Sequence, residues 1–141
     1  MIVLVFDADA IIPLLDETHV FHDRLKKLNE KLIKHKPRCL FPITALAEAM
    51  RHFQTANQPE LAWALVEIIK RGTIRPQSVV PIDDQIFKGA MQLFDPWGDA
   101  GDTFFDAIVA TIARQNNARA VVSFDDGYRK MEVPLAEDVF R

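Results

Sequence analysis

The run Ile2-Val3-Leu4-Val5-Phe6-Asp7 is the stretch that decides the fold class. Its first five residues are all apolar, and they do not alternate with polar residues as a half-exposed strand would. A continuous apolar run of this length is typical of a central strand that is buried on both faces of a parallel sheet. The run ends at a carboxylate, and a carboxylate that closes a buried strand needs a partner. We therefore expect an α/β protein with residues 2–6 near the middle of its sheet.

Outward from this strand, strand-like segments alternate with segments of helical periodicity. Further strands are predicted at residues 39–41 and 118–124, with a last short strand at 133–139 and a broken extended segment at 73–81. Helices are predicted at residues 8–15, 18–35, 44–53, 58–71, 84–94 and 104–116, and a turn-rich loop at 95–101. This order favours a three-layer α/β/α fold with a central, mainly parallel sheet and right-handed crossovers. We expect one domain over residues 1–141.

Single residues predict where several of these helices begin and end. Thr44 and Thr103 are predicted N-caps, because a threonine hydroxyl can accept a hydrogen bond from a first-turn N–H. Gly72 is predicted to close the helix before it, since glycine adopts the left-handed conformation common after a helix. Pro13 restricts the helix at its position to a short first turn. The chain has a single cysteine, Cys39, so an internal disulfide is excluded. Cys39 is expected to be a small core residue.

Composition and charge narrow the class of protein. The 141 residues are 49% hydrophobic and 26% charged, as in an ordinary globular domain. The longest apolar stretch, residues 1–6, is far shorter than the roughly 18 residues of a membrane span, so we expect a cytoplasmic protein with no membrane partner. The net charge of −3 does not by itself indicate a nucleic-acid binder. Carboxylates gathered on a cation would leave the remaining surface close to neutral, so the distribution of charge matters more than its sum.

Acidic residues follow separate predicted strands. Asp7 comes directly after the first strand, and Asp125 and Asp126 come directly after the strand at residues 118–124. Ligands of parallel sheets bind beyond the carboxyl ends of the strands, so these acids are expected to meet there. Two more acids fit the same place, since Glu48 follows the second strand and Asp106 lies in the first turn of the most apolar helix. Crowded carboxylates need a bound cation or a shared proton, and oxygen ligands favour Mg2+ or Mn2+.

Each acid taken alone also has a structural interpretation. Asp106 lies three residues after Thr103, so these two residues can form a capping box. Asp125 and Asp126 precede a glycine, a sequence that is common in turns. Glu48 alone is typical of a solvated helix position. The combination of these acids is therefore far more specific than any one of them.

Four segments carry a resemblance to a known family: Val5-Phe6-Asp7-Ala8-Asp9, Ile43-Thr44-Ala45-Leu46-Ala47-Glu48, Phe105-Asp106-Ala107-Ile108-Val109-Ala110-Thr111-Ile112-Ala113 and Val122-Ser123-Phe124-Asp125. Through them the chain resembles the PIN-domain ribonucleases, and most closely the VapC-like toxins of toxin–antitoxin pairs. The resemblance covers essentially the whole chain, and the third segment is the most specific. It implies a metal-dependent endoribonuclease, a cognate antitoxin whose tail covers the active cleft, and a homodimer.

The resemblance also implies a set of site residues. One or two Mg2+ or Mn2+ ions would be held by four catalytic acids, namely Asp7, Glu48, Asp106 and Asp125. Ser123 matches a serine or threonine that supports the site by hydrogen bonding. The chain departs from the family at Asp9, where Ser, Thr or Asn is usual, and Asp9 is a further candidate ligand. It departs also at Asp102, where an apolar residue is more typical, and at Gly127, where an aspartate is common.

The chemistry expected from such a site is cleavage of RNA phosphodiester bonds by metal-activated water. The sequence offers no Ser, Cys or His arrangement that suggests a side-chain nucleophile. An RNA substrate requires positive charge near the acids. The candidates for RNA binding are Arg51, His52, Arg114, Arg129 and Lys130.

Two alternative functions remain open from the sequence. A haloacid-dehalogenase-like phosphatase would use Asp7 and Asp9 as its Asp-x-Asp motif and would form a covalent aspartyl phosphate. That alternative leaves Glu48 and Asp106 without a role. The other alternative is a non-catalytic PIN-like module that binds RNA or a protein partner without cutting RNA.

Overall fold

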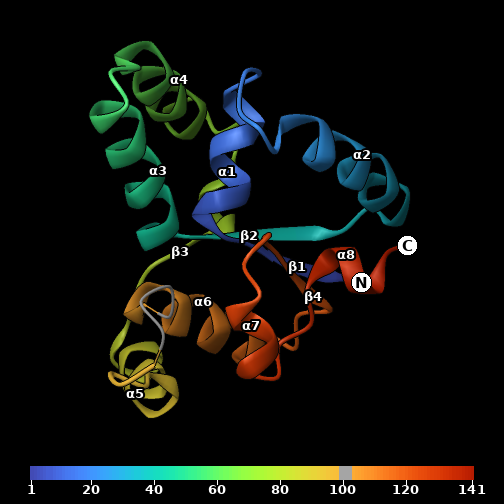
Figure 1. Ribbon diagram of the computed structural model, residues 1–141, viewed down its shortest axis with the longest axis vertical. Helices are drawn as coiled ribbons and strands as arrows, with labels where there is room; N and C mark the ends of the chain where they lie inside the picture. The colour runs from blue at the N-terminus through green and yellow to red at the C-terminus, as the bar shows by residue number, and fades with distance from the viewer. Residues whose placement is uncertain (99–102) are drawn as a thin grey trace.

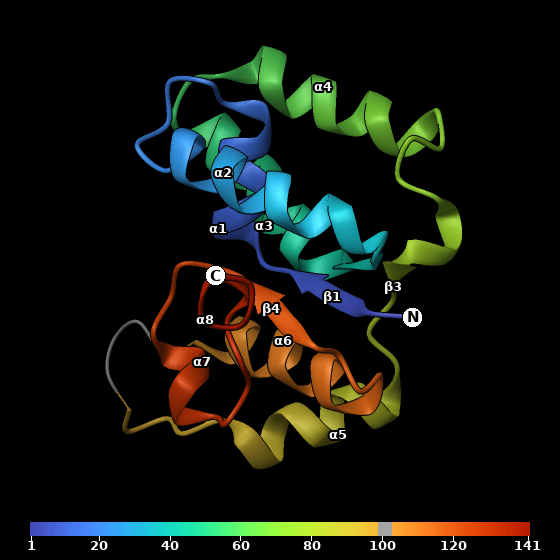
Figure 2. The same cartoon turned by 90° about the vertical axis from the view of Figure 1, so that its right-hand side faces the viewer.

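The computed structural model describes residues 1–98 and 103–141, which form three layers (Figures 1 and 2). The middle layer is a parallel sheet in the order β3-β2-β1-β4, made of β1 (Val3–Phe6), β2 (Arg38–Pro42), β3 (Val79–Val80) and β4 (Ala120–Val122). One face carries α1 (Ala8–Leu15), α2 (His22–Leu32), η1 (Ile33–His35), α3 (Ile43–Thr55) and α4 (Pro59–Lys70). The other face carries α5 (Asp84–Leu93), α6 (Phe104–Gln115) and α7 (Gly127–Lys130). Short segments complete the chain, namely η2 (Pro76–Ser78) and, packed against β4, α8 (Ala136–Val139). The predicted three-layer α/β/α fold is confirmed.

The opening strand lies in the interior of the sheet, as its sequence predicts. In β1, Val5 pairs with Leu40 of β2 on one side and with Val121 of β4 on the other. Leu4 and Phe6 belong to the hydrophobic core under α1 to α4, whereas Val5 belongs to the core under α5 to α7. Successive strand residues point to opposite faces, so a strand covered on both faces needs apolar residues at every position.

The helix ends confirm two of the predicted caps and correct one. Thr103 N-caps α6, and Gly72 follows α4 with φ of +73°, in the left-handed region where glycine is favoured. Thr44 is not an N-cap, because α3 begins at Ile43 directly after Pro42 and has no side-chain cap. β2 extends through the proline, so the helix begins before Thr44 and this residue falls inside its first turn. The prediction for Thr44 was therefore wrong.

The helix predicted at residues 18–35 begins later, at His22. The N–H and the hydroxyl of Thr18 both donate to Asp16 Oδ1, at 3.0 and 2.7 Å, and the N–H of Phe21 donates to His19 Nδ1 at 3.1 Å. Such local bonds between side chains and backbone compete with helix formation. The segment between α1 and α2 is consequently a turn, although its apolar residues lie at helical spacing.

Pro13 does not shorten α1, which continues through it to Leu15. The proline is buried, and its carbonyl accepts a hydrogen bond from His22 Nδ1 at 2.7 Å. Cys39 is only half-buried at the edge of a core rather than inside it. No helix in residues 1–98 and 103–141 is long and apolar enough to cross a membrane.

The C-terminal part of the fold differs from the prediction in two ways. β4 has three residues rather than seven, and the predicted strand at 133–139 is reduced to a single bridge between Val121 and Leu135, followed by α8. Ala136 and Phe140 are four residues apart and both enter the core, which is the spacing of a helix face. In the predicted loop at 95–101, residues 99–101 lie outside the described part of the chain, as does Asp102.

Candidate active site

Asp7 lies at the carboxyl end of β1, where the strand turns into α1. Its backbone N–H donates to the Val122 carbonyl of β4 at 3.1 Å, and its Oδ1 caps α1 by accepting from the Ala8 N–H at 2.8 Å. The side chain is buried, with 5% of its residue surface exposed. The strand register therefore fixes the Asp7 carboxylate against the end of β4, which supplies the next residues of the site.

Ser123 follows β4 and connects three of the acids. Its buried hydroxyl lies 3.2 Å from Asp7 Oδ2 and 3.1 Å from Asp9 Oδ2, and it accepts the N–H of Asp125 at 3.1 Å. Asp9 Oδ2 also accepts the N–H of Phe124 at 3.0 Å. Ser123 thus contacts the carboxylates of Asp7 and Asp9 and the backbone of Asp125. The Asp125 carboxylate itself accepts the Gly127 N–H at 2.8 Å, as its turn interpretation predicts.

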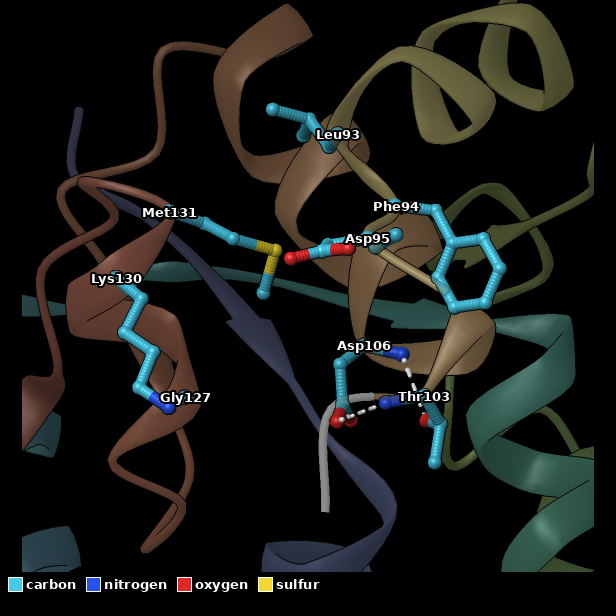
Figure 3. A pocket seen from close by; sticks show the side chains of 9 residues that line it. Leu93, Phe94, Asp95, Thr103, Asp106, Gly127, Lys130 and Met131 are labelled. Atoms are coloured by element: carbon cyan, nitrogen blue, oxygen red, sulfur yellow. Dashed lines mark hydrogen bonds between the residues drawn. The ribbon is translucent and has the colours of Figure 1, made fainter. Parts of the chain in front are cut away.

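Asp106 enters the same cluster from the first turn of α6 (Figure 3). It forms the capping box with Thr103, in which the Thr103 N–H donates to Asp106 Oδ2 and the Asp106 N–H donates to Thr103 Oγ1, both at 3.3 Å. Its other oxygen, Oδ1, accepts from the Tyr128 hydroxyl at 3.4 Å. The box engages one carboxylate oxygen only, so the structural and functional interpretations of Asp106 are compatible.

Tyr128 is a member of the site that the sequence analysis missed. Its side chain is fully buried on α7, and its hydroxyl donates to Asp106 Oδ1 at 3.4 Å. The same hydroxyl offsets part of the rise in the pKa of Asp7. The sequence could have indicated Tyr128 by its position, because it lies three residues, or about one helical turn, after Asp125. A buried phenol needs a hydrogen-bond acceptor, and here the acceptors are the clustered acids.

Glu48 reaches the cluster from α3 with one oxygen that has no partner. Within residues 1–98 and 103–141, the buried side-chain nitrogen and oxygen atoms that lack a hydrogen bond are Asp9 Oδ1, Thr44 Oγ1 and Glu48 Oε1. Two of the three belong to acids of the cluster, and Thr44 lies one helical turn before Glu48. Buried polar atoms are rarely left unpaired in folded proteins, so these oxygens mark a place built for a ligand.

The clustered carboxyl groups hold their protons unusually tightly. Burial, followed by the negative charges of neighbouring acids, raises the pKa of Glu48 from 4.5 to about 7 and the pKa of Asp106 from 3.8 to about 7. Burial also raises the pKa of Asp7, with the Asp9 charge adding to the effect, and the pKa of Asp9 is raised in turn. Hydrogen bonds from Ser123 to both aspartates offset part of this rise. Four acids therefore repel one another strongly enough to favour a bound proton or cation.

The acids form an open cluster. Among the described residues, no three His, Cys, Asp or Glu side chains already stand around a common point that could hold a metal ion. Closing the cluster on one ion therefore requires rotation of carboxylate side chains, and for Glu48 this rotation breaks no hydrogen bond to Oε1. The donor atoms are all carboxylate or hydroxyl oxygens, which suit Mg2+ and Mn2+.

Two hollows adjoin the acids. A groove of about 480 Å³ between α3 and the start of α6 is lined by Thr44, Ala47, Glu48, Arg51, His52, Thr55 and Phe105. A smaller pocket of about 190 Å³, seen in Figure 3, is lined by Leu93, Phe94, Asp95, Thr103, Asp106, Ala107, Gly127, Lys130 and Met131. A ligand can thus approach Glu48 from the groove and Asp106 from the pocket.

The predicted RNA-binding residues divide into two groups. Arg51 and His52 line the groove beside Glu48, and Lys130 lines the pocket beside Asp106. Arg51 and Lys130 thus place positive charge beside the carboxylates, and His52 adds an imidazole on the Glu48 side.

The other two basic candidates are engaged elsewhere. Arg129 forms ion pairs with Asp126 and with Asp138, the latter at 2.9 Å. Arg114 lies two turns beyond Asp106, about 12 Å along the helix axis, and donates to the Met131 carbonyl. The structure therefore does not bring Arg114 to the acids.

Comparison with known proteins agrees with this arrangement. The PIN domain family model matches residues 4–134, so the chain belongs to the PIN domain family. The match confirms the resemblance seen in the sequence and decides against the haloacid-dehalogenase alternative. No curated protein matches the chain by sequence.

Solved structures share the fold at low sequence identity. VapC20 of Mycobacterium tuberculosis, a Sarcin-Ricin loop cleaving toxin, is similar with a TM-score of 0.76 and 15% identity over 92% of this chain and 95% of that one. FitAcB from Neisseria gonorrhoeae has a TM-score of 0.70 and 15% identity over 94% and 95%. VapBC2 from Rickettsia felis, bound to a DNA fragment from its promoter, has a TM-score of 0.64 and 13% identity over 95% and 97%. At these identities the likeness establishes the PIN fold that VapC proteins share.

Proposed function

We propose that the protein is a metal-dependent endoribonuclease that cleaves RNA phosphodiester bonds. The observation that carries the proposal is the convergence of Asp7, Glu48, Asp106 and Asp125 at the carboxyl ends of the strands, with a raised pKa at three of them. Membership of the PIN family supports the same conclusion. Like charges crowded in a partly buried cluster lower the stability of a fold, so their retention is understandable if they serve a cation.

The residues present fit a divalent metal ion. Asp7, Glu48, Asp106 and Asp125 would hold it, and Asp9 is an additional donor because its Oδ1 is buried without a partner. Such an ion lowers the pKa of a coordinated water and neutralises charge that develops on the phosphate. Ser123 would keep Asp7, Asp9 and Asp125 at a fixed spacing, and Tyr128 would do the same for Asp106.

The basic side chains of the two hollows would bind the RNA backbone. Arg51 and His52 line the groove beside Glu48, and Lys130 lines the pocket beside Asp106. Phosphate contacts of this kind position a nucleic acid without reading its sequence. The RNA would therefore cross the acids from one hollow to the other.

We propose further that the protein is the toxin of a toxin–antitoxin pair, with a cognate antitoxin and a homodimeric state. The support is the PIN fold shared with VapC20, named as a toxin, and with VapBC2. Co-expression with the product of a neighbouring small reading frame should yield a complex that no longer cuts RNA. Light scattering on the purified protein should give twice the monomer mass, and a monomer would contradict the dimer.

The test of the enzymatic proposal is metal-dependent cleavage of a mixed single-stranded RNA. Wild type should cut with Mg2+ or Mn2+ and stop with EDTA, and Asp7→Asn should lose several orders of magnitude in rate. The products should carry 5′-phosphates, because water is the expected nucleophile, whereas 2′,3′-cyclic phosphates would indicate attack by the ribose hydroxyl. Cleavage that survives EDTA, or full activity of Asp7→Asn, would refute the proposal. RNA binding without any cleavage would identify the non-catalytic alternative.

A further inference from the structure

A row of ring side chains borders the carboxylate cluster, and we call it the aromatic row. It consists of His52, His19, Phe21 and Phe124, whose ring centroids are successively 6.4, 5.6 and 4.9 Å apart. The four rings come from three separate segments, namely α3, the turn before α2 and the residue that follows Ser123. Their contact therefore depends on tertiary structure, and no sequence periodicity reveals it.

Both ends of the aromatic row adjoin acids of the site. His52 lies one helical turn after Glu48 and lines the same groove. At the other end, Phe124 directly precedes Asp125 and donates its N–H to Asp9 Oδ2 at 3.0 Å. The row consequently runs along the edge of the cluster from the Glu48 side to the Asp125 side.

The middle of the row is not explained by core packing. Phe21 is half-buried and belongs to neither of the two hydrophobic cores. The Arg24 guanidinium lies over the Phe21 ring at 5.6 Å and over the Phe124 ring at 4.7 Å, and Arg24 Nε donates to Glu137 Oε2 at 2.7 Å. A cation held over two aromatic rings, next to an anion-processing site, is an arrangement that suits a nucleic-acid strand.

We propose that the aromatic row stacks the bases of single-stranded RNA next to the bond that is cut. The inference rests on the proposed function, because it takes RNA as the substrate. Every base has a flat face, so stacking on Phe21 and Phe124 would hold unpaired bases with little dependence on sequence. Arg24 lies over the same two rings and is paired with Glu137, so it fixes the rings in place. Single-stranded loops whose bases can be splayed out are the RNA regions that such a surface can bind.

The experiment uses the full chain at pH 6 with EDTA, so that no RNA is cut during the measurement. Fluorescence anisotropy measures the Kd for a short single-stranded RNA, and a 2-aminopurine in that RNA reports stacking by quenching. Phe21→Leu, which keeps an apolar side chain but removes the ring, should weaken binding by about 5- to 50-fold and abolish the quenching. Phe21→Tyr keeps the ring and should bind within about two-fold of wild type.

Two controls separate stacking from other effects. Phe87→Leu removes a ring that is more exposed than Phe21, at 46%, and lies on α5 at the opposite face, so it should leave the Kd unchanged. An RNA of the same length with abasic residues should bind wild type and Phe21→Leu equally. Any one of three results overturns the inference. These are that Phe21→Leu binds intact RNA as tightly as wild type does, that its loss of affinity is the same for abasic RNA as for intact RNA, and that wild type binds no RNA. A row that serves a protein partner instead gives the first of these results.

The outcome is distinguishable from failure of the proposed function. One outcome is that wild type proves unable to cut RNA with Mg2+ or Mn2+ while Phe21→Leu still loses affinity for intact RNA. Base stacking on the aromatic row is then supported and the nuclease proposal is refuted. If wild type cuts RNA and Phe21→Leu cuts with unchanged KM, the nuclease proposal is supported and base stacking on the aromatic row is refuted.

Discussion

Replacement of Glu48 by glutamine removes two costs at once, namely the burial of a charge and the repulsion within the carboxylate cluster. No hydrogen bond to the Glu48 Oε1 atom is lost, because that buried oxygen has no partner. The change removes a negative charge that faces Asp7, Asp106 and Asp9, while the size of the side chain stays the same. Metal-free Glu48→Gln should therefore be more stable than wild type wherever Glu48 is ionised.

The size and sign of this effect follow from the raised pKa of Glu48. A rise from 4.5 to about 7 corresponds to at most roughly 3 kcal/mol. Because the side chain is only half-buried, solvent screening reduces the expected gain to about 1–2 kcal/mol. The folded state binds the proton more tightly, so the contribution of protonated Glu48 to stability is complete below about pH 4.5 and is lost as the pH rises through about 7.

Thermal melts of wild type and Glu48→Gln from pH 5 to 8.5 in EDTA measure the effect. The two proteins should melt together near pH 5, and the variant should melt roughly 3–8 °C higher above pH 7.5. Saturating Mn2+ should raise the Tm of wild type more than that of the variant, because one ligand is gone. Glu30→Gln on the exposed side of α2 is the control and should follow wild type at every pH. Parallel curves for Glu48→Gln and wild type would refute the idea that burial and the neighbouring charges raise the pKa of Glu48.

Four further substitutions test individual residues in and beside the site. Asp106→Asn should abolish cleavage while costing about 0.5–2 kcal/mol in chemical denaturation, whereas intact cleavage would reduce Asp106 to a capping residue. Tyr128→Phe removes one buried hydroxyl that donates to a carboxylate, so it should lower the free energy of unfolding at pH 7.5 by about 1–2 kcal/mol, and an unchanged value would mean that the bond contributes nothing. Asp125→Ala should lower the cleavage rate far more than Asp126→Ala, because the exposed side chain of Asp126 pairs with Arg129. Equal losses of cleavage rate would argue for a paired-acid site.

Sequence reasoning reached the sheet and its acids because both depend on local patterns. The apolar run at residues 2–6 indicates a strand covered on both faces, and the rule that ligands bind beyond strand ends then selects Asp7 and Asp125. Tyr128 and the contact between Phe21 and Phe124 were missed, because nothing in the local sequence indicates which distant group a buried hydroxyl or a ring meets.

The errors in the predicted elements have the same origin. Thr44 has a good N-cap side chain, but β2 ends at Pro42 and the helix starts two residues too early for Thr44 to cap it. The apolar residues at 133–139 suit a strand as well as a helix, and packing of Ala136 and Phe140 into the core decides for the helix. Tertiary contacts override local preference in both cases.

The most direct test of whether the carboxylate cluster is a metal site is a titration of the purified protein with Mn2+. Electron paramagnetic resonance follows the free ion. Wild type at pH 7.5 should deplete the free-ion signal with one or two equivalents, and Glu48→Gln and Asp106→Asn should each weaken binding by at least about ten-fold. Lowering the pH below about 7 should weaken binding, because protons then compete with the ion for the carboxyl groups of Glu48 and Asp106. A wild-type protein that leaves the Mn2+ signal unchanged, or variants that bind as tightly as wild type, would contradict the assignment of these acids to a metal ion.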